Sequence, residues 1–352
     1  MEQVVVTGLG VVLTNAAGII GGWSSASAGE GIFLTVPSCR HELTDLIERE
    51  SQRAFAELER DRSRFSVSWS VSKNGYNCWE QWANQGNERF FSDFDALDLA
   101  RRFRFGGQVM CPVAACATGS HALILGARLI EQGEADVVLC GTSEPPQHPM
   151  ILAAYRNMGA LSASGVMRPF DRRRDGFLSA SGSGFLILES LEHAQKRGAR
   201  IHARLMGYSM RSDATHMTSM CPSGDSVVRA IEEALERAGN PAVGYVNAHG
   251  TATRLNDELE ARAISRVWGN RVAVSSTKSL TGHLLGASGA IEAVLSIVAM
   301  KERLLPPTLG LEEPEGELNF VMGEERRAEV EAVLSLNYGF GGHIGAILFA
   351  HR

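Results

Sequence analysis

Features that would indicate a disulfide scaffold, a fibre, a membrane anchor or a nucleic-acid binder are scarce in this sequence. The six cysteines are scattered over 352 residues, form no C-x-x-C pair and join no histidine at zinc spacing. The 37 glycines show no period. No apolar run reaches about 18 residues, so no membrane-spanning helix is predicted. A net charge of −6 gives no overall attraction for a polyanion such as nucleic acid.

The amino-terminal segment also lacks the pattern of an export signal. It has no basic residue ahead of its apolar stretch, it carries Glu2, and glycines at positions 8, 10 and 18 interrupt it. This pattern is typical of a strand followed by a loop. Cysteines in such a chain are expected to remain free thiols in a reducing compartment. We therefore expect a soluble, cytoplasmic protein.

Short β-branched runs alternate with longer helical patterns, which predicts a layered α/β fold. With 44% hydrophobic and 21% charged residues the chain can form a large core. Strands are expected at 4–6, 65–71, 137–140, 185–188, 245–248, 272–275, 333–336 and 346–349, and helices at about 43–60, 121–132, 227–238, 257–267 and 290–301. Glycines 133 and 239 are expected to cap two of these helices. We divide the chain into two halves of similar rhythm, residues 1–195 and 196–352.

Cys116 is the strongest candidate for a nucleophile. It lies in the segment PVAACATGSH, where a short apolar stretch meets the start of a helical pattern. The unpaired N–H groups and the positive dipole end of a helix favour the thiolate, which is the reactive form of cysteine. The alternative is a buried structural cysteine, and it is the better interpretation of the other five.

Two histidines occur in similar surroundings, each just after a predicted strand. His249 follows YVNA and precedes a glycine and two threonines, whereas His283 follows VSSTKSLTG and precedes a helix rich in glycine and alanine. Functional groups collect beyond the carboxyl ends of strands in α/β sheets. Two neutral imidazoles that each donate one N–H to the same oxygen would form an oxyanion hole. A single histidine is more often a structural hydrogen-bonding group than a catalytic one, but two histidines in matching contexts, together with Cys116, favour the functional interpretation.

Four charged residues flank the two histidines. Lys278 precedes the second histidine, Asp257 and Glu260 follow the first, and Glu292 lies on the last helical pattern. Asp257 and Glu260 resemble a capping box at a helix start, which is the alternative to a role in a site. Glu292 would be costly to bury alone, and Lys278 is its expected partner.

Together these segments resemble the elongating β-ketoacyl-acyl-carrier-protein synthases, the condensing enzymes of fatty acid and polyketide synthesis. The matching motifs are VVVTGLG at 4–10, ACATG at 115–119, NAHGTAT at 247–253, SSTKSLTGH at 275–283 and GFGG at 339–342, in the family's order. The resemblance is nearly continuous from about residue 65 to the end of the chain. It implies a thiolase-type five-layer α/β/α/β/α fold. A catalytic set of one cysteine and two histidines resembles that of the elongating branch. The initiating branch uses Cys, His and Asn, and the thiolases use a second cysteine.

The resemblance implies a role for each matching residue. Cys116 would accept the acyl chain, and His249 and His283 would hold the malonyl thioester carbonyl while CO2 leaves. The backbone N–H groups of Cys116 and Phe340 would form the oxyanion hole, and Phe340 would also gate the acyl pocket. The product would be a 3-oxoacyl thioester, and the protein would be an acyltransferase of chain elongation.

Other matching residues would support this chemistry. The residues of an ionic network would be Lys278, Asp257, Glu260 and Glu292. The contacts to the pantetheine arm would be made by Thr251 and Thr253. No metal or organic cofactor is implied, because the substrates are carried on the 4′-phosphopantetheine of an acyl carrier protein.

Several positions depart from the family pattern. Asn256 stands where the family has glycine, Ser181 takes a position that is usually acidic, and Ile344 replaces an asparagine that helps to fix the gating loop. We expect Asn256 to preserve a turn because asparagine tolerates positive φ, and the loop around Phe340 to be held differently. The chain is shorter than the elongating synthases, mostly before residue 65, where part of a helical layer that supports the dimer and the acyl pocket is expected to be missing. The stretch NCWEQW at 77–82 is a candidate to cover that surface.

The expected partners are an acyl carrier protein and a second subunit, in a homodimer or in a heterodimer with a related ketosynthase. Carrier proteins are acidic, so a local basic patch is expected. The candidate clusters are Arg101, Arg102 and Arg104; Lys196, Arg197 and Arg200; and residues 172–174. Solvated helix faces or ordinary ion pairs are the alternative for each cluster.

Two other functions compete with a condensing enzyme. The first is a non-catalytic chain-length factor that partners a true synthase, against which Cys116 and both histidines argue. The second is a hydrolase with a Cys/His pair, which would need a base within reach of the thiol and open access for water.

Overall fold

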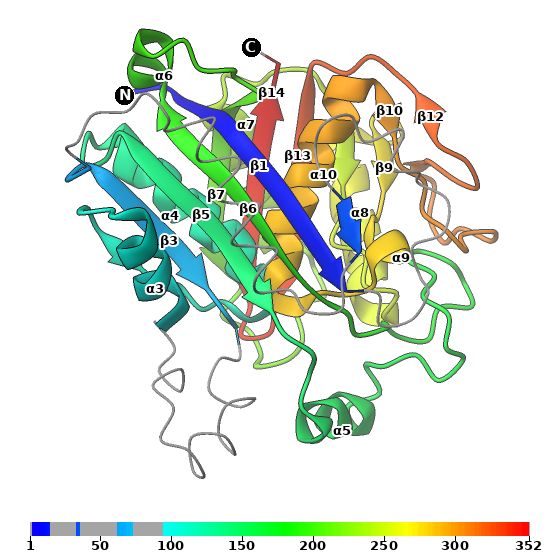
Figure 1. Cartoon of the computed structure of the whole chain (residues 1–352). Helices are drawn as coiled ribbons and strands as arrows, with labels where there is room; N and C mark the ends of the chain where they lie inside the picture. Colours follow the sequence, from blue (N-terminus) through cyan, green and yellow to red (C-terminus); the bar gives the residue numbers. More distant parts are fainter. Residues whose placement is uncertain (1, 15–32, 36–61, 73–93, 352) are drawn as a thin grey trace.

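The computed structural model describes residues 2–14, 33–35, 62–72 and 94–351. Twelve of the described strands form one sheet in the order β11-β9-β8-β13-β14-β7-β1-β6-β5-β3-β4, with β2 paired to β1, and β10 pairs with β12 (Figure 1). The strands are β1 Val4–Thr14, β2 Phe33–Thr35, β3 Phe65–Ser70, β4 Val109–Met110, β5 Val137–Glu144, β6 Ser181–Ser190, β7 Ala203–Ser212, β8 Val243–Asn247, β9 Ala273–Ser275, β10 Leu304–Leu305, β11 Asn319–Phe320, β12 Arg326–Arg327, β13 Ala332–Gly339 and β14 His343–Ala350.

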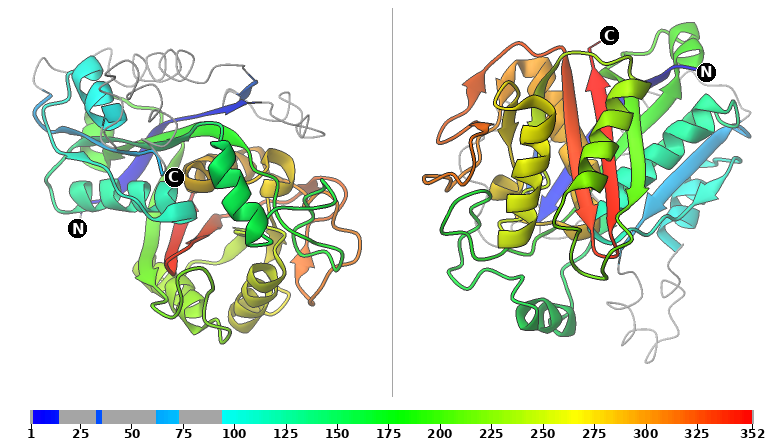
Figure 2. Two further views of the ribbon diagram at one scale, coloured as in Figure 1. Left: turned by 90° about the horizontal axis from the view of Figure 1, so that it is seen from below. Right: turned by 180° about the vertical axis from the view of Figure 1, so that it is seen from behind.

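Two buried helices, α4 and α10, lie between the strands of the two halves (Figures 1 and 2). Helix α4 packs against β3 and β5 on one side and β7 and β14 on the other, while α10 packs against β6 and β13. Helix α3 covers β3, and α7 covers β7 and β14 with α8 beside it. The helices are α3 Phe94–Phe103, α4 Thr118–Glu131, α5 Pro149–Asn157, α6 Leu191–Lys196, α7 Asp225–Arg237, α8 Arg254–Trp268, α9 Lys278–Thr281 and α10 Ser288–Glu302. This arrangement confirms the predicted five-layer α/β/α/β/α fold.

The composition of each helix explains its layer. Helix α10, with the sequence SGAIEAVLSIVAMKE, is apolar on nearly all sides and is buried from its first residue to Met300, as expected for a helix enclosed between sheets. Helix α7 instead buries residues three or four positions apart, such as Val227, Ala230, Ile231 and Ala234, and turns its charged face to solvent. The central position of α4 and α10 therefore follows from their lack of a polar face.

The two central helices start with the same local structure. A 3₁₀ turn at Ala115–Ala117 precedes α4, and a second at Leu285–Ala287 precedes α10. The first residue of each turn has a positive φ, 47° at Ala115 and 48° at Leu285. The two halves therefore share a structural motif at the start of their central helices. Strands β1 and β7 join the halves through a short antiparallel pairing. The division at residues 195 and 196 stays a prediction.

The central helices touch backbone to backbone. A Cβ atom on Gly119 of α4 would collide with the backbone nitrogen of Ala290 on α10, and one on Gly289 of α10 would collide with the backbone nitrogen of Ser120 on α4. Glycine is required here because of this close approach, since both residues have ordinary helical φ. The crossing fixes the starts of both helices relative to each other.

The predicted elements are confirmed wherever the structure describes them, generally with longer bounds. Gly133 and Gly239 end α4 and α7 with φ of 70° and 78°, as predicted. Strand β7 was missed because its sequence, ARLMGYSMRS, contains no Val, Ile or Thr, whereas β-branched runs had been the criterion. The helix expected at 43–60 and the segment at 77–82 lie outside the described residues. No described helix is long and apolar enough to cross a bilayer.

We predict that Gly119→Ala destabilises the protein by about 1–3 kcal/mol, the usual result of overpacking, although alanine favours helix formation. Urea unfolding measures the change. Gly133→Ala is the control, because a Cβ there meets no atom within 4 Å and only the positive φ is strained. A Gly119→Ala variant as stable as the wild type would contradict the close helix contact.

Candidate active site

The predicted site residues meet at one cavity of about 480 Å³. Its lining includes the nucleophile candidate, both histidines, the gate candidate and the two threonines, namely Cys116, His249, His283, Phe340, Thr251 and Thr253. They come from the starts of the central helices, from the loops after β8 and β9, and from the end of β13. These six residues, which are far apart in the chain, therefore lie at one cavity.

Cys116 occupies the middle of the 3₁₀ turn before α4 and is 6% exposed. The hydroxyl of Thr118 stabilises this turn, because Oγ1 accepts a hydrogen bond from Ala114 N at 2.9 Å and donates one to Ala115 O at 2.7 Å. The strained φ of Ala115 directs the chain from the apolar stretch into the helix. The thiol therefore lies at the amino-terminal end of α4, at the positive end of the helix dipole.

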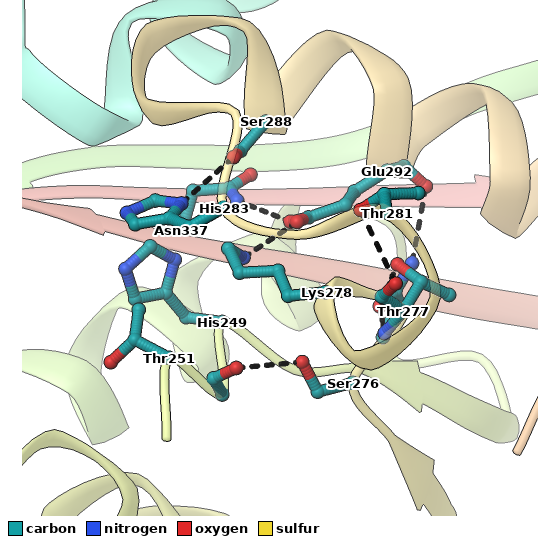
Figure 3. A network of polar contacts seen from close by, with 12 residues as sticks. His249, Thr251, Ser276, Thr277, Lys278, Thr281, His283, Ser288, Glu292 and Asn337 are labelled. Atoms are coloured by element: carbon teal, nitrogen blue, oxygen red, sulfur yellow. Dashed lines mark hydrogen bonds and ion pairs between the residues drawn. The ribbon is translucent and has the colours of Figure 1, made fainter. Parts of the chain in front are cut away.

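His249 and His283 lie side by side, with ring centroids 5.6 Å apart and planes at 86° (Figure 3). Both are almost fully buried. The Nδ1 atom of His283 shares a hydrogen bond with Ser288 Oγ at 3.1 Å, and its ring packs edge-on against Phe177 at 4.9 Å. In His249 the Nδ1 atom is buried and has no hydrogen-bond partner among the described residues, and the residue lines the cavity.

Burial keeps His249 neutral. Its pKa lies well below the usual 6.5 because of desolvation, with further lowering by the charge of Lys278 and by His283. A neutral imidazole has one N–H donor and one acceptor nitrogen. The ring can therefore donate its one N–H to a carbonyl oxygen and stabilise the negative charge that develops on that oxygen.

The four charged residues form two hydrogen-bonded arrangements, which are linked because the charge of Lys278 also lowers the pKa of Glu260. Lys278 Nζ and Glu292 Oε1 form a buried ion pair at 2.5 Å. Asp257 and Glu260 instead bind backbone N–H groups of the loop after β8. Helix α8 begins at Arg254, so Asp257 is its fourth residue and not its N-cap. The capping-box alternative is therefore wrong.

These backbone contacts shape the loop that carries His249. Glu260 accepts hydrogen bonds from His249 N at 2.7 Å and Gly250 N at 2.8 Å. Asp257 accepts them from Thr251 N at 3.0 Å and Ala252 N at 3.1 Å. Four consecutive N–H groups are thus bound by two buried carboxylates. The hydroxyls of Thr251 and Thr253 lie 2.9 Å apart at the cavity wall.

The end of β13 lies against the nucleophile turn. A Cβ on Gly339 would be 3.1 Å from Cys116 N, so Phe340 follows directly beside the cysteine backbone. Gly341 N donates to Met217 O at 2.7 Å, and Asp213 N donates to Gly342 O at 2.7 Å. These bonds anchor the loop after Phe340 to residues 213–217. The hypothesis that this loop is held differently stays a prediction.

The remaining departures have simple structural positions. Asn256 is the third residue of α8 and has no positive φ, so the expectation that it preserves a left-handed turn is wrong; the positive φ in this loop belongs to Ala252, at 61°. Ser181 begins β6 and is buried. Ile344 is fully buried on β14, and its carbonyl accepts a 3.4 Å hydrogen bond from His121 Nε2.

Ion pairs account for much of the basic clusters. Arg101 and Arg102 both pair with Asp98. Arg197 pairs with the buried Glu189 at 2.6 Å. Arg174 is only 3% exposed and binds the carbonyl of Arg254 at 2.8 Å, so it braces the loop at the start of α8 and presents little charge to a partner.

Sequence reasoning missed Asn337 and Tyr338, the residues just before the Gly339 turn. Both are buried, and Tyr338 lines the cavity with its ring 5.1 Å from that of His249. The available signal was a polar pair at the end of an apolar strand, next to the GFGG motif. Among the described residues no group of three or more His, Cys, Asp or Glu is arranged to hold a metal ion.

Two domain families match successive parts of the chain. The family described as "Beta-ketoacyl synthase, N-terminal domain" matches residues 59–194, and "Beta-ketoacyl synthase, C-terminal domain" matches residues 202–312. Among curated proteins, 3-oxoacyl-acyl-carrier-protein synthase 2 of Synechocystis is 45% identical over 270 residues, which is 73% of this chain and 64% of that protein. The protein of the same name from Coxiella burnetii is 40% identical over 68% of this chain and 60% of its own length. The matched part of this chain thus spans somewhat less than two thirds of the length of these relatives.

Solved structures show the same fold. A β-ketoacyl synthase from Burkholderia phymatum aligns with a TM-score of 0.85 at 28% identity and covers 100% of both chains. The AntDE:AntF complex, described as a type II polyketide synthase acyl carrier protein with its ketosynthase, contains a chain that aligns with a TM-score of 0.86 at 28% identity, over 100% of this chain and 99% of that one. The architecture is therefore that of ketosynthases with the thiolase-type fold.

The buried carboxyl of Glu260 should make stability depend on pH. Burial raises its pKa from 4.5 to about 7, so the folded chain binds more protons than the unfolded chain between these values. This group therefore lowers the free energy of unfolding as pH rises through that window. In Glu260→Gln the decrease in the free energy of unfolding between pH 5 and pH 7 should be smaller than in the wild type by about 2 kcal/mol, since each pKa unit corresponds to ~1.4 kcal/mol.

Urea unfolding at the two pH values measures this difference. Glu258→Gln is the matched control, because Glu258 lies on the same helix, is half exposed and pairs with Arg262. Parallel pH dependence in the wild type and Glu260→Gln would contradict the assignment of the raised pKa to Glu260.

Proposed function

Since the chain belongs to the β-ketoacyl synthase family, we propose that it is a 3-oxoacyl-acyl-carrier-protein synthase of fatty acid or polyketide-type elongation. It joins an acyl group held on Cys116 to the two-carbon unit of malonyl-acyl-carrier protein. The observation that carries this proposal is the single cavity shared by Cys116, His249 and His283. A nucleophile and two imidazoles at one cavity suit acyl transfer followed by carbanion formation.

The first half-reaction loads the nucleophile. The Cys116 thiolate attacks the thioester carbonyl of an acyl-carrier protein, and the backbone N–H groups of Cys116 and Phe340 stabilise the tetrahedral oxyanion. The carrier thiolate then leaves, takes up a proton, and the acyl group remains on Sγ. The location of Gly339 against Cys116 N supports this pair of donors. Removal of one such donor typically lowers the rate by ~10²–10³.

The second half-reaction forms the carbon–carbon bond. His249 and His283 donate hydrogen bonds to the malonyl thioester oxygen, so the electron pair of the breaking C–CO2 bond is held as an enolate. The enolate carbon attacks the acyl carbonyl on Cys116, and the Sγ–C bond breaks to release the 3-oxoacyl thioester. The pKa of His249, held below its usual value by burial, supports a neutral hydrogen-bond donor in this step.

The proposed reaction requires no metal or organic cofactor, because the thioester stabilises the carbanion and the substrates arrive on 4′-phosphopantetheine. Thr251 and Thr253, on the cavity wall, are proposed to contact the pantetheine arm. The proposed partners are an acyl carrier protein and a second subunit, either a copy of this chain or a related ketosynthase. Chain length factors pair with ketosynthases in similar solved structures, but the complete Cys/His/His set favours a catalytic subunit.

We predict that an acyl-carrier protein deposits its acyl group on Cys116 and that malonyl-carrier protein then discharges it as a 3-oxoacyl product. Mass spectrometry of the intact protein follows both steps. Cys116→Ala should show no adduct. Cys221→Ala is the control, because Cys221 is the more exposed thiol and has a pKa lowered mainly by its hydrogen bond with Ser223. An adduct that hydrolyses without malonyl-carrier protein would favour the hydrolase, and no adduct would favour a partner subunit.

We also predict that His249→Ala and His283→Ala each lower CO2 release from malonyl-carrier protein by ~10²-fold or more, the effect of losing one oxyanion donor. Both variants should retain a measurable acyl adduct, because the oxyanion hole for loading is built from backbone groups. Release of labelled CO2 measures the loss, and His351→Ala, at an exposed position, is the control. Unchanged CO2 release in both variants would contradict the proposed roles.

A further inference from the structure

Asn337 connects the buried ion pair to the nucleophile helix. It is fully buried on β13, two residues before Gly339. Its Nδ2 donates a 2.6 Å hydrogen bond to Glu292 Oε2, and its Oδ1 accepts one from Ser120 Oγ on α4. Glu292 Oε1 in turn pairs with Lys278 (Figure 3). Polar contacts therefore run without a gap from Lys278 to a residue four positions after the nucleophile.

The amide lies at the point where the two central helices cross. A Cβ on Gly289 would be 3.0 Å from Asn337 Oδ1, so the same glycine that allows the helix contact also leaves space for this side chain. A buried carboxylate has two oxygens to satisfy, and here Lys278 binds one and Asn337 the other. A carboxylate that loses one partner in such an enclosed place is strongly destabilised.

The charge of Glu292 depends on its surroundings. Burial raises the pKa of this carboxyl, whereas Lys278 and the Asn337 amide lower it. The ionisable groups that face it are Lys278 from α9 and Tyr245 from β8; α4 contributes only the hydroxyl of Ser120 to this network, through Asn337. Asn337 cannot ionise, so its hydrogen bond favours the charged carboxylate at every pH.

We propose that Asn337 is a positioning residue that keeps Glu292 ionised as the counter-ion of Lys278, and so preserves the electrostatic setting in which the two histidines bind the malonyl thioester. This inference rests on the proposed condensing function. It concerns the malonyl step and not the loading of Cys116, because Lys278 acts on His249 and the loading donors are backbone groups.

Two variants test the proposal with opposite pH effects. Asn337→Leu removes the amide at similar volume, so Glu292 should take up a proton at higher pH, and the acid limb of kcat/KM for malonyl-carrier protein should rise by about 1 pH unit. In Asn337→Asp a proton shared between the two carboxyls replaces the amide donor. Its activity should approach the wild type at low pH and fall as this proton is lost at higher pH.

Acyl loading of Cys116, followed by mass spectrometry, should keep its wild-type pH dependence in both variants. Ser120→Ala is the matched control, because it removes the contact to Asn337 Oδ1 and leaves the hydrogen bond to Glu292; its acid limb should match the wild type. The proposal is overturned if both variants lose activity by the same factor at every pH, or if neither profile moves.

Urea unfolding at pH 5 and pH 8 provides a readout without substrates. Asn337→Leu should lose more stability at pH 8 than at pH 5, since the amide stabilises only the charged Glu292, and an equal loss at both values would also overturn the proposal. A wild type that makes no 3-oxoacyl product would refute the proposed function, while this unfolding comparison would still decide whether Asn337 controls the charge of Glu292.

Discussion

Helices α4 and α10 are in direct backbone contact at Gly119 and Gly289, and the remainder of the site depends on that contact. Each helix begins with a 3₁₀ turn of the same geometry, so fixing the crossing fixes both turns. The first turn presents Cys116, and the second follows directly after His283. Because glycine leaves no side chain between the helices, the nucleophile and a histidine can line one cavity although 167 positions of sequence, about half of the chain, separate them.

Charged side chains in such a buried part of the molecule need partners. Glu260 and Asp257 meet this requirement by binding four consecutive N–H groups of the loop that carries His249. Lys278 and Glu292 meet it by pairing with each other. The first arrangement fixes the position of the histidine, and the second places a positive charge that helps to keep it neutral. The low dielectric that makes unpaired charges costly also strengthens the hydrogen bonds offered to a substrate oxygen.

Most of the catalytic candidates could be found from the sequence because each lies where an element starts or ends. Cys116 precedes a helix, and His249 and His283 follow strands, so short motifs mark them. The backbone partners of Asp257, which are Thr251 N, Ala252 N and Phe170 N, could not be predicted because they are set by the fold of the loop. Asn337 was missed because its local signal, a polar residue near the end of an apolar strand, does not reveal that its amide bridges Ser120 and Glu292.

The sequence by itself determined the alternation of strands and helices, the apolar character of the two central helices and the residue types available for chemistry. Periodicity and terminal glycines are local properties, so they can be interpreted without coordinates. Only the tertiary structure decided that Asp257 and Glu260 bind backbone N–H groups, and that Ser120, Asn337 and Glu292 form one connection. These partners lie up to 217 positions apart, and hydrogen bonds act over about 3 Å, so the crossing of the helices selects them.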